Sequence, residues 1–305
     1  MLFVLVLDKL NIMSILSDNY TIFFCGISKN CIDNLPKNLD FLTSFFESSK
    51  YNCNAILVDS DSIDGTKKLL NDFSLHKENI IYQDLDGLEL KFSNRIERIQ
   101  ISRNKCLDLI KSSENEQKII YIPLDLDIDL FKYTSVESFE KLIDYCINKD
   151  QANGIFPFST PYYYDIFALR ATNWNKINSQ YWVKKLKKYF KIGSFVYNYI
   201  LIFKRQITIS KFKLKKPKIY SAFGGIGVYK LDNSMPSYEL SKKNPEDVSE
   251  HVKFNYKFNE LEILPHWNVP APNEHLEFRL LKLRKKFRYF LKTIFFDLSK
   301  DNSNS

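Results

Sequence analysis

The fold of this chain is constrained most by an alternation of apolar runs and amphipathic stretches between residues 20 and 147. Continuous apolar runs, as in strands buried on both faces, occupy 20–27 (YTIFFCGI) and 55–58 (AILV), and further strands are expected at 80–83 and 118–123 (KIIYIP). The other stretches repeat apolar residues at helical spacing and occupy 32–46, 66–73, 95–112 and 136–146. Strands that alternate with helices form a mostly parallel sheet with right-handed crossovers, so the sequence predicts an α/β fold of the Rossmann type.

Composition narrows the class of protein. Of the 305 residues 45% are hydrophobic, and no internal repeat is visible, which excludes a disordered chain and disfavours a solenoid. The five cysteines form no Cys-x-x-Cys pair and leave an odd number, so neither a disulfide framework nor a zinc site is expected. The first 13 residues lack the basic start and the small-residue cleavage site of a signal peptide. We therefore expect a cytoplasmic protein.

Positive charge is concentrated in two segments. Residues 183–218 contain twelve Lys or Arg and no acidic residue, and residues 277–296 contain seven against one Glu. Lysine-rich segments with many aromatics suit an anionic membrane surface better than nucleic-acid bases, so no nucleic-acid partner is expected. Residues 278–296 predict a basic amphipathic helix, which would place the protein at the inner face of a membrane. The alternative is that both segments pack on the core through their apolar sides.

The sharpest chemical signal is an acidic strand end. Asp125, Asp127 and Asp129 directly follow the apolar run 118–123 and alternate with Leu and Ile. In an extended chain the three carboxylates point the same way, and they repel each other unless a cation or a polar site holds them. Oxygen ligands without His or Cys suit Mg²⁺ or Mn²⁺, which usually share a phosphate. A solvated edge strand is the alternative.

Helix 95–112 places Arg103 within its apolar stripe, between Ile99 and Cys106. A buried guanidinium without a partner is costly, so Arg103 must meet an anion. A bound phosphate and an aspartate of the acidic strand end are the two candidates, and both place Arg103 beside the carboxylates.

These residues resemble the nucleotide-sugar-binding half of GT-A-type glycosyltransferases, loosely of the α-1,3-mannosyltransferase-like and capsule or lipopolysaccharide kinds. The resemblance is carried by Cys25-Gly26 at the first strand end, VDSDSIDGT at 58–66, Ser-Arg-Asn-Lys at 102–105 and IPLDLDID at 122–129. It implies that Asp59, with Asp61 as a second candidate, contacts the base or ribose of the donor. It also implies that Asp125 and Asp127, with Asp129 beside them, hold the ribose and a divalent cation on the diphosphate. Cys25, Arg103 and Asn104 complete the expected donor-binding set.

The second half of the chain is expected to form the acceptor side. Tyr162–Tyr164 offer aromatic faces for sugar rings, and Asp165 and Arg170 offer polar partners, although a packed core strand is the alternative. Phe223-Gly-Gly-Ile-Gly227 uses three of only eight glycines and lacks the features of a phosphate loop. We expect the backbone at Gly224 and Gly225 to approach a bound sugar, with an ordinary bulged strand as the alternative.

Glu250 and His251 form an adjacent pair of an acid and an imidazole. An inverting sugar transfer needs a base for the acceptor hydroxyl, and Glu250 is the candidate, together with Asp165 as the other catalytic candidate. His251 is a candidate ligand of the metal or the phosphate, and His266-Trp267 is a further site candidate in a proline-rich stretch. A surface pair without function is the alternative for Glu250 and His251.

The sequence thus predicts a GT-A-like catalytic domain over 20–270 and a basic extension over 271–305. Residues 20–130 would bind the nucleotide sugar, and residues 131–270 would bind the acceptor. The expected activity is metal-dependent transfer of a hexose from a UDP- or GDP-sugar to a glycan or lipid-linked acceptor. The alternatives are a nucleotidyltransferase that makes an activated sugar and a non-catalytic membrane-surface protein.

Overall fold

The computed structural model describes residues 20–113, 118–149, 153–172, 217–231, 235–239 and 249–272, together with Tyr181, Trp182, Lys185 and Gln206. The chain divides into two units, Met1–Pro270 and Ala271–Ser305. Every helix and strand named below belongs to the first unit. The amphipathic helix expected over 278–296 and most of the basic segment 183–218 lie outside the described residues. Within the described part, no helix is both long and apolar enough to cross a membrane.

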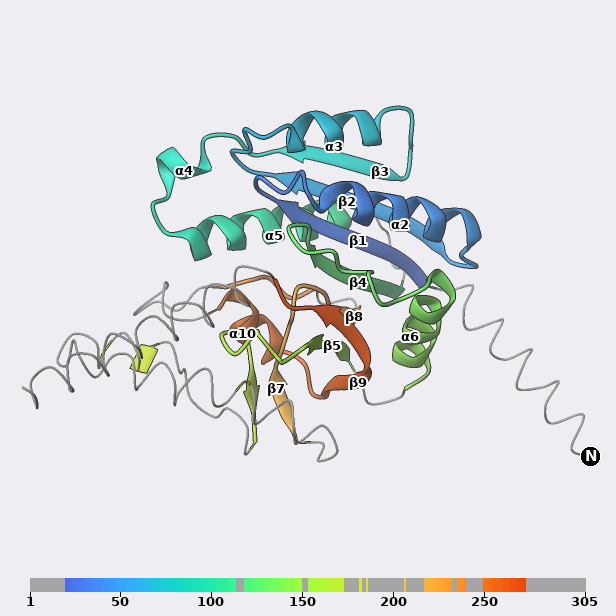
Figure 1. The fold of residues 1–305 in the computed structure, drawn as a ribbon, viewed down its shortest axis with the longest axis vertical. Helices are drawn as coiled ribbons and strands as arrows, with labels where there is room; N and C mark the ends of the chain where they lie inside the picture. The colour runs from blue at the N-terminus through green and yellow to red at the C-terminus, as the bar shows by residue number, and fades with distance from the viewer. Residues whose placement is uncertain are drawn as a thin grey trace, which may run out of the picture. The chain divides into compact units, whose positions relative to one another are not determined.

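The described residues of the first unit form one sheet of nine strands, in the order β3-β2-β1-β4-β8-β5-β9-β7-β6 (Figure 1). Its strands are β1 (Tyr20–Ser28), β2 (Asn52–Asp59), β3 (Ile80–Asp84), β4 (Lys118–Asp125), β5 (Gly154–Thr160), β6 (Arg170–Ala171), β7 (Ile219–Ser221), β8 (Val228–Leu231) and β9 (Leu261–Pro270). The pairs among β3, β2, β1 and β4 are parallel, as is β5 with β9, and the remaining pairs are antiparallel. The expected α/β class with a mostly parallel sheet is confirmed.

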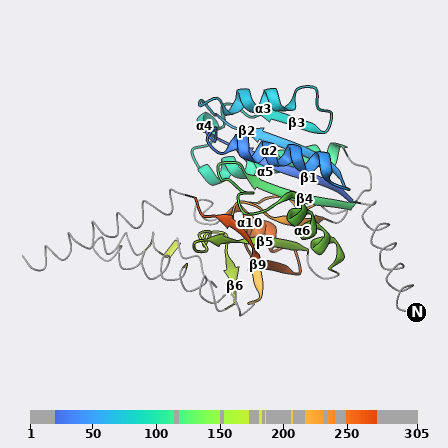
Figure 2. The same cartoon turned by 45° about the vertical axis from the view of Figure 1, so that its right-hand side comes forward.

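Helices cover both faces of this sheet (Figure 2). They are α2 (Leu35–Ser48), α3 (Thr66–Ser74), α4 (Leu88–Lys91), α5 (Arg95–Ser113), α6 (Val136–Asn148) and α10 (Glu250–Asn255). Ile22 and Phe24 of β1 share a buried cluster with α2, α3 and α6, whereas Phe23 and Cys25 share another with α5 and α10. Because both faces are covered, β1 is apolar along its whole length rather than at every second residue.

The acidic strand end differs from the extended chain expected from the sequence. Strand β4 ends at Asp125, and the chain then turns, with the amide of Ile128 donating to the carbonyl of Asp125 over 3.4 Å. Asn38 on α2 draws this turn towards the helix, since its side-chain amide donates to the carbonyls of Leu126 (3.3 Å) and Ile128 (2.8 Å). Leu126 and Ile128 are buried as expected, but the three aspartates no longer follow one extended strand.

Candidate functional site

The candidate site lies at the carboxyl edge of the parallel strands. Strand β1 pairs with β2 on one side and with β4 on the other: the chain passes from β1 to β2 and β3 on one side and then returns to β4 on the other, so the strand order reverses at β1. Ligands of open α/β sheets bind outside the carboxyl ends of the strands, where the strand order reverses. The loops that follow β1 and β2 are bound together there, because the amide of Asn30 donates to Ser62 Oγ (2.7 Å) and the amide of Ile63 donates to Asn30 Oδ1 (2.8 Å).

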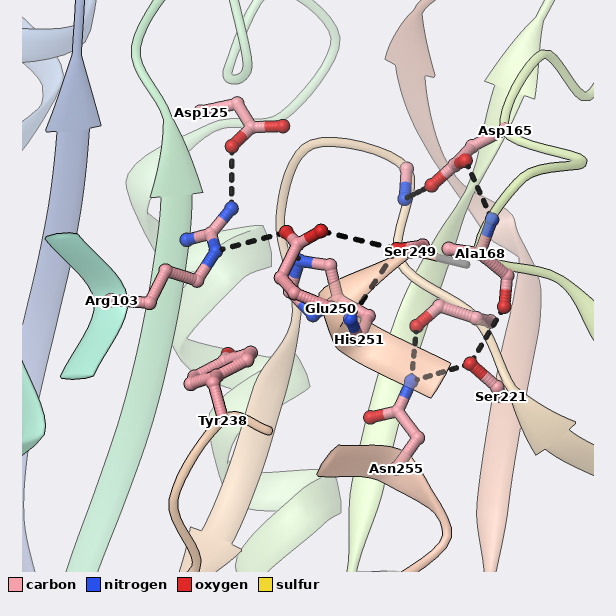
Figure 3. A network of polar contacts seen from close by, with 12 residues as sticks. Arg103, Asp125, Asp165, Ala168, Ser221, Tyr238, Ser249, Glu250, His251 and Asn255 are labelled. Carbon is pink, nitrogen blue, oxygen red and sulfur yellow. Dashed lines mark hydrogen bonds and ion pairs between the residues drawn. The ribbon is translucent and has the colours of Figure 1, made fainter. Parts of the chain in front are cut away.

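Arg103 meets the acidic strand end, as its place in the apolar stripe of α5 indicated. Its Nη2 donates to Asp125 Oδ1 over 2.5 Å, and the arginine side chain is 1% exposed while that of Asp125 is 32% exposed (Figure 3). Burial lowers the pKa of Arg103, but the neighbouring acidic groups, with Asp125 first and Glu250 among them, together outweigh this and leave its pKa raised. The guanidinium is therefore permanently charged, and Asp125 remains the member of the pair that solvent or a ligand can reach.

A second carboxylate faces Arg103 from the other half of the chain. Glu250 begins α10, where the hydroxyl of Ser249 caps the helix, and its Oε1 lies 3.5 Å from Arg103 Nε (Figure 3). Burial raises the pKa of Glu250, and the positive charge of Arg103 lowers it in part. The structure thus brings together Glu250, Arg103 and Asp125, which are far apart in the sequence.

His251 does not reach the acidic strand end. Its ring stacks on Phe223, with centroids 3.7 Å apart, and is 2% exposed. Burial, together with the charge of Arg103, lowers the pKa of His251 well below its usual value, so the ring is neutral. The expected role of His251 as a metal ligand therefore finds no support in its position.

The glycine turn Gly224-Gly225 connects the two halves of the site. Both glycines have φ of +88°, a left-handed backbone that other residues rarely adopt. The carbonyl of Gly225 accepts from the amide of Asp125 (2.8 Å), and the amide of Gly224 donates to Asp165 Oδ2 (3.0 Å). The turn thus fixes the backbone of one candidate carboxylate and the side chain of another.

Asp165 is held by backbone amides at both oxygens, since Ala168 donates to Oδ1 over 3.1 Å and Gly224 donates to Oδ2. Burial raises its pKa, and these two amide bonds lower it in part. Arg170 is nearly buried, and its Nη1 donates to the carbonyls of Phe167 (3.1 Å) and Leu169 (2.7 Å). Tyr163 is buried in the core, whereas Tyr162 and Tyr164 are half-buried.

Asp127 and Asp129 lie beyond the end of β4. Asp127 is exposed at the turn, and its carbonyl accepts from Asn34 Nδ2 over 2.7 Å. Asp129 Oδ2 lies 3.5 Å from Lys37 Nζ on α2. The expectation that one extended strand carries all three carboxylates is therefore wrong, because the strand ends at the first of them.

The aspartates at the end of β2 and in the loop after it make hydrogen bonds within the protein. Asp59 is fully buried and accepts from Ser28 Oγ (2.7 Å) and Ser62 Oγ (2.5 Å), so it has no surface that faces a donor base. Burial raises the pKa of Asp59, and the two hydroxyl bonds lower it in part. Asp61 accepts from the amides of Gly87 (2.7 Å) and Glu89 (3.0 Å) at the start of α4.

Two further donor-binding candidates are structural in this fold. Cys25 is fully buried beneath α5, and burial raises the pKa of its thiol well above the usual range. Asn104 binds the backbone of Tyr238 at two points, accepting from its amide (2.8 Å) and donating to its carbonyl (3.0 Å). His266 and Trp267 lie on β9 rather than in a loop, and Trp267 is buried against Phe139.

The carboxylates fit a divalent cation only in part. Among the described residues, no group of three or more His, Cys, Asp and Glu side chains is arranged to hold a metal ion. Asp125 engages Arg103 through one oxygen and stays partly exposed, and Asp127 is exposed beside it, so these two offer the hard oxygen ligands that Mg²⁺ and Mn²⁺ prefer. Such a site would need the phosphates of a ligand to complete it.

Sequence reasoning missed the aromatic residues that surround Arg103. The guanidinium carbon lies 4.8 Å from the ring centre of Phe223 and 5.9 Å from that of Tyr238. Neither aromatic stands at a spacing that relates it to α5, and only the requirement of a partner for a buried arginine pointed in this direction. Ser28 and Ser62, which bind Asp59, were also missed.

Three solved structures illustrate what the chain is similar to. They are S. aureus TarS residues 1–349 (TM-score 0.46, 13% identity, 83% of this chain and 61% of that chain), the mannosyltransferase PcManGT from Pyrobaculum calidifontis in complex with GDP-Man and Mn²⁺ (0.45, 10%, 90% and 64%) and mannosyl-3-phosphoglycerate synthase from Rubrobacter xylanophilus (0.40, 14%, 90% and 74%). TarS has also been solved with UDP and with UDP-GlcNAc.

The likeness concerns the fold. The chain spans less than two thirds of the length of the TarS and PcManGT structures. No protein-family model matches the chain, and a search of curated proteins gives no match.

Proposed function

We propose that this chain is a glycosyltransferase that moves a hexose from a nucleoside-diphosphate sugar to a glycan or lipid-linked acceptor. The observation that carries the proposal is the position of Asp125: a partly exposed carboxylate at the carboxyl end of β4, beside β1, where the strand order reverses. The parallel half of the sheet would bind the donor, which we take to be a UDP- or GDP-hexose. The catalytic domain would then span residues 20–270, with 271–305 as the basic extension.

Asp125 and Asp127 are the residues that would hold Mg²⁺ or Mn²⁺ together with the diphosphate of the donor. A cation in that place would stabilise the negative charge of the leaving diphosphate. The protein's own contribution is to orient Asp125, through Arg103 at its side chain and Gly225 at its amide.

Glu250 is the proposed base if the transfer inverts the sugar. A base must be ionised before it takes the proton of the acceptor hydroxyl, and it works best when its pKa lies near the working pH. Burial raises the pKa of Glu250 towards that range, while Arg103 favours the ionised form. Asp165 is the proposed partner of an acceptor hydroxyl, because its two amide bonds fix the orientation of the carboxylate.

The proposed location is the inner face of a membrane, in keeping with a lipid-linked acceptor. The charge of segments 183–218 and 277–296 supports this proposal. Binding to vesicles with and without anionic lipid measures it, and the proposal expects retention that weakens as salt increases.

A thermal-shift screen of sugar nucleotides, with and without Mn²⁺, tests the function. The proposal expects stabilisation by a UDP- or GDP-sugar that requires the metal. Stabilisation by a nucleoside triphosphate alone would favour a nucleotidyltransferase instead, and no response to any nucleotide would point to a non-catalytic protein.

Two variants sharpen this test. Asp127→Asn should remove the metal-dependent shift and leave unfolding without ligand unchanged, because Asp127 is exposed. Glu250→Gln should abolish turnover while nucleotide binding stays within a few-fold of the wild type. Full turnover of the Glu250 variant would remove this residue as the base.

A further inference from the structure

We propose that Arg103 is a positioning residue that holds Asp125 and Glu250 in a fixed relation. One buried guanidinium thus fixes the position of the donor-side carboxylate relative to that of the proposed base on the acceptor side. The proposal rests on the proposed function, which gives these two carboxylates their separate tasks. It assigns to Arg103 no contact with either substrate.

The guanidinium reaches the two carboxylates through different edges. Nη2 donates to Asp125 Oδ1 over 2.5 Å, whereas Nε lies 3.5 Å from Glu250 Oε1 (Figure 3). The nitrogens of a guanidinium lie in one rigid plane, so the hydrogen bond at Nη2 sets the direction of Asp125 and the ion pair at Nε keeps Glu250 beside the same rigid group. A lysine carries the same charge at a single point and cannot impose that relation.

The guanidinium itself has little freedom to move. It lies over the rings of Phe223 (4.8 Å) and Tyr238 (5.9 Å), and attraction between a cation and aromatic faces is strengthened when both are removed from water. Tyr238 is fixed in turn, because Asn104 binds its backbone at two points and Tyr121 Oη lies 3.2 Å from its hydroxyl. The guanidinium of Arg103 is therefore held by two aromatic rings as well as by the two carboxylates.

The arrangement connects two parts of the chain that fold from distant segments. Arg103 and Asp125 belong to the parallel half, with α5 and β4, whereas Glu250 begins α10, which follows the antiparallel strands. Among the described residues, Gln100 and Asn104 on α5 donate to the carbonyl of Tyr238 rather than to helix α10. The Arg103 to Glu250 contact is thus a direct charged link between donor half and proposed base.

Arg103→Met and Arg103→Lys test this assignment, with Arg95→Met on the exposed start of the same helix as the matched control. Calorimetry measures the binding of UDP and GDP in the presence of Mn²⁺, and single-turnover transfer measures the chemical step. We expect Arg103→Met to weaken nucleotide binding about 10–100-fold, the effect of losing one charge-assisted hydrogen bond, and to reduce the transfer rate as well. Arg103→Lys should recover binding or transfer in part but not both, and Arg95→Met should change neither.

Double variants separate positioning from a general loss of stability. If Arg103 acts through the carboxylates, Arg103→Met should add little to Asp125→Asn in nucleotide binding, and it should add little to Glu250→Gln in the residual transfer rate. Effects that multiply in both pairs, or binding and transfer at the wild-type level in Arg103→Met, would overturn the proposal.

The two proposals fail in different ways. A wild-type chain that binds no nucleotide with or without Mn²⁺ contradicts the proposed function. The contact of Arg103 with Asp125 and Glu250 is then measured by urea unfolding of the same single and double variants. Non-additive changes in the free energy of unfolding in both pairs support the proposal, and additive changes overturn it.

Discussion

Replacing Gly225 with alanine should be one of the most costly single-methyl additions in this fold. Residue 225 has φ of +88°, where a side chain costs about 1–2 kcal/mol. An added Cβ would also lie 2.9 Å from Ile128 Cδ1, 3.1 Å from Leu130 Cδ2 and 3.2 Å from Tyr164 Oη. Ile128 and Leu130 are buried, so making room for the methyl group costs a further amount of about 1–3 kcal/mol.

Gly224 provides the matched control for this prediction. It has the same φ of +88°, but a Cβ there would meet no atom closer than Pro157 Cγ at 3.6 Å. Gly224→Ala should therefore lower the free energy of unfolding by the backbone cost alone, about 1–2 kcal/mol. Gly225→Ala should lower it by about 2–5 kcal/mol, because the packing cost is added.

Urea unfolding followed by tryptophan fluorescence and circular dichroism measures both variants, and an unchanged dependence on denaturant shows that the difference is one of stability. Equal losses in the two variants would refute the packing argument, and no loss in Gly224→Ala would refute the backbone argument. Since the carbonyl of Gly225 binds the amide of Asp125, Gly225→Ala should also weaken nucleotide binding more than Gly224→Ala does.

Two further predictions concern residues around the site. Asn104→Ala removes the two hydrogen bonds to the backbone of Tyr238 and should lower the free energy of unfolding, measured in urea, by about 1–3 kcal/mol. An unchanged midpoint would mean that the backbone at Tyr238 is held in another way. Asp165→Asn should change the pH dependence of stability. Burial raises the pKa of Asp165 above its ordinary value of 3.8, so the folded chain binds the proton of this carboxyl group more tightly than the unfolded chain does. The wild type should therefore lose stability relative to Asp165→Asn as the pH rises from 3.8 through the folded pKa, and a gain over that range would contradict the argument.

Local patterns predicted much of the fold. The continuous apolar runs located β1, β2 and β4, because a strand covered on both faces cannot alternate with polar residues, whereas β3 lies at the edge of the sheet and is only partly buried. The place of Arg103 in an apolar stripe predicted a charged partner, and the structure provides it in Asp125. Each of these inferences depends on spacing within a single element.

The site could be predicted less well, because its geometry depends on contacts between elements. The three aspartates after β4 read as one extended face, but the amide of Asn38 bends the chain after Asp125. Asp59 ends β2 as expected, yet the hydroxyls of Ser28 and Ser62 bind its carboxylate and remove it from the surface. No spacing in the sequence relates Asn38 to the turn after Asp125, or Ser28 to Asp59.

Charge balance gives a physical reason for the proposed cation. Arg103 shares one positive charge between Asp125 and Glu250, so this group of three carries a net negative charge when both carboxylates are ionised. His251 adds no charge, because its buried ring is neutral, and the exposed Asp127 adds another negative charge beside Asp125. A diphosphate that approaches Asp125 is therefore repelled unless a cation arrives with it, and repulsion between nearby charges is strong where water is excluded. Neutralising Asp127 alone would relieve part of this repulsion and remove a ligand at the same time. Asp127→Asn should accordingly weaken nucleotide binding in the presence of Mn²⁺ and strengthen the residual binding in its absence.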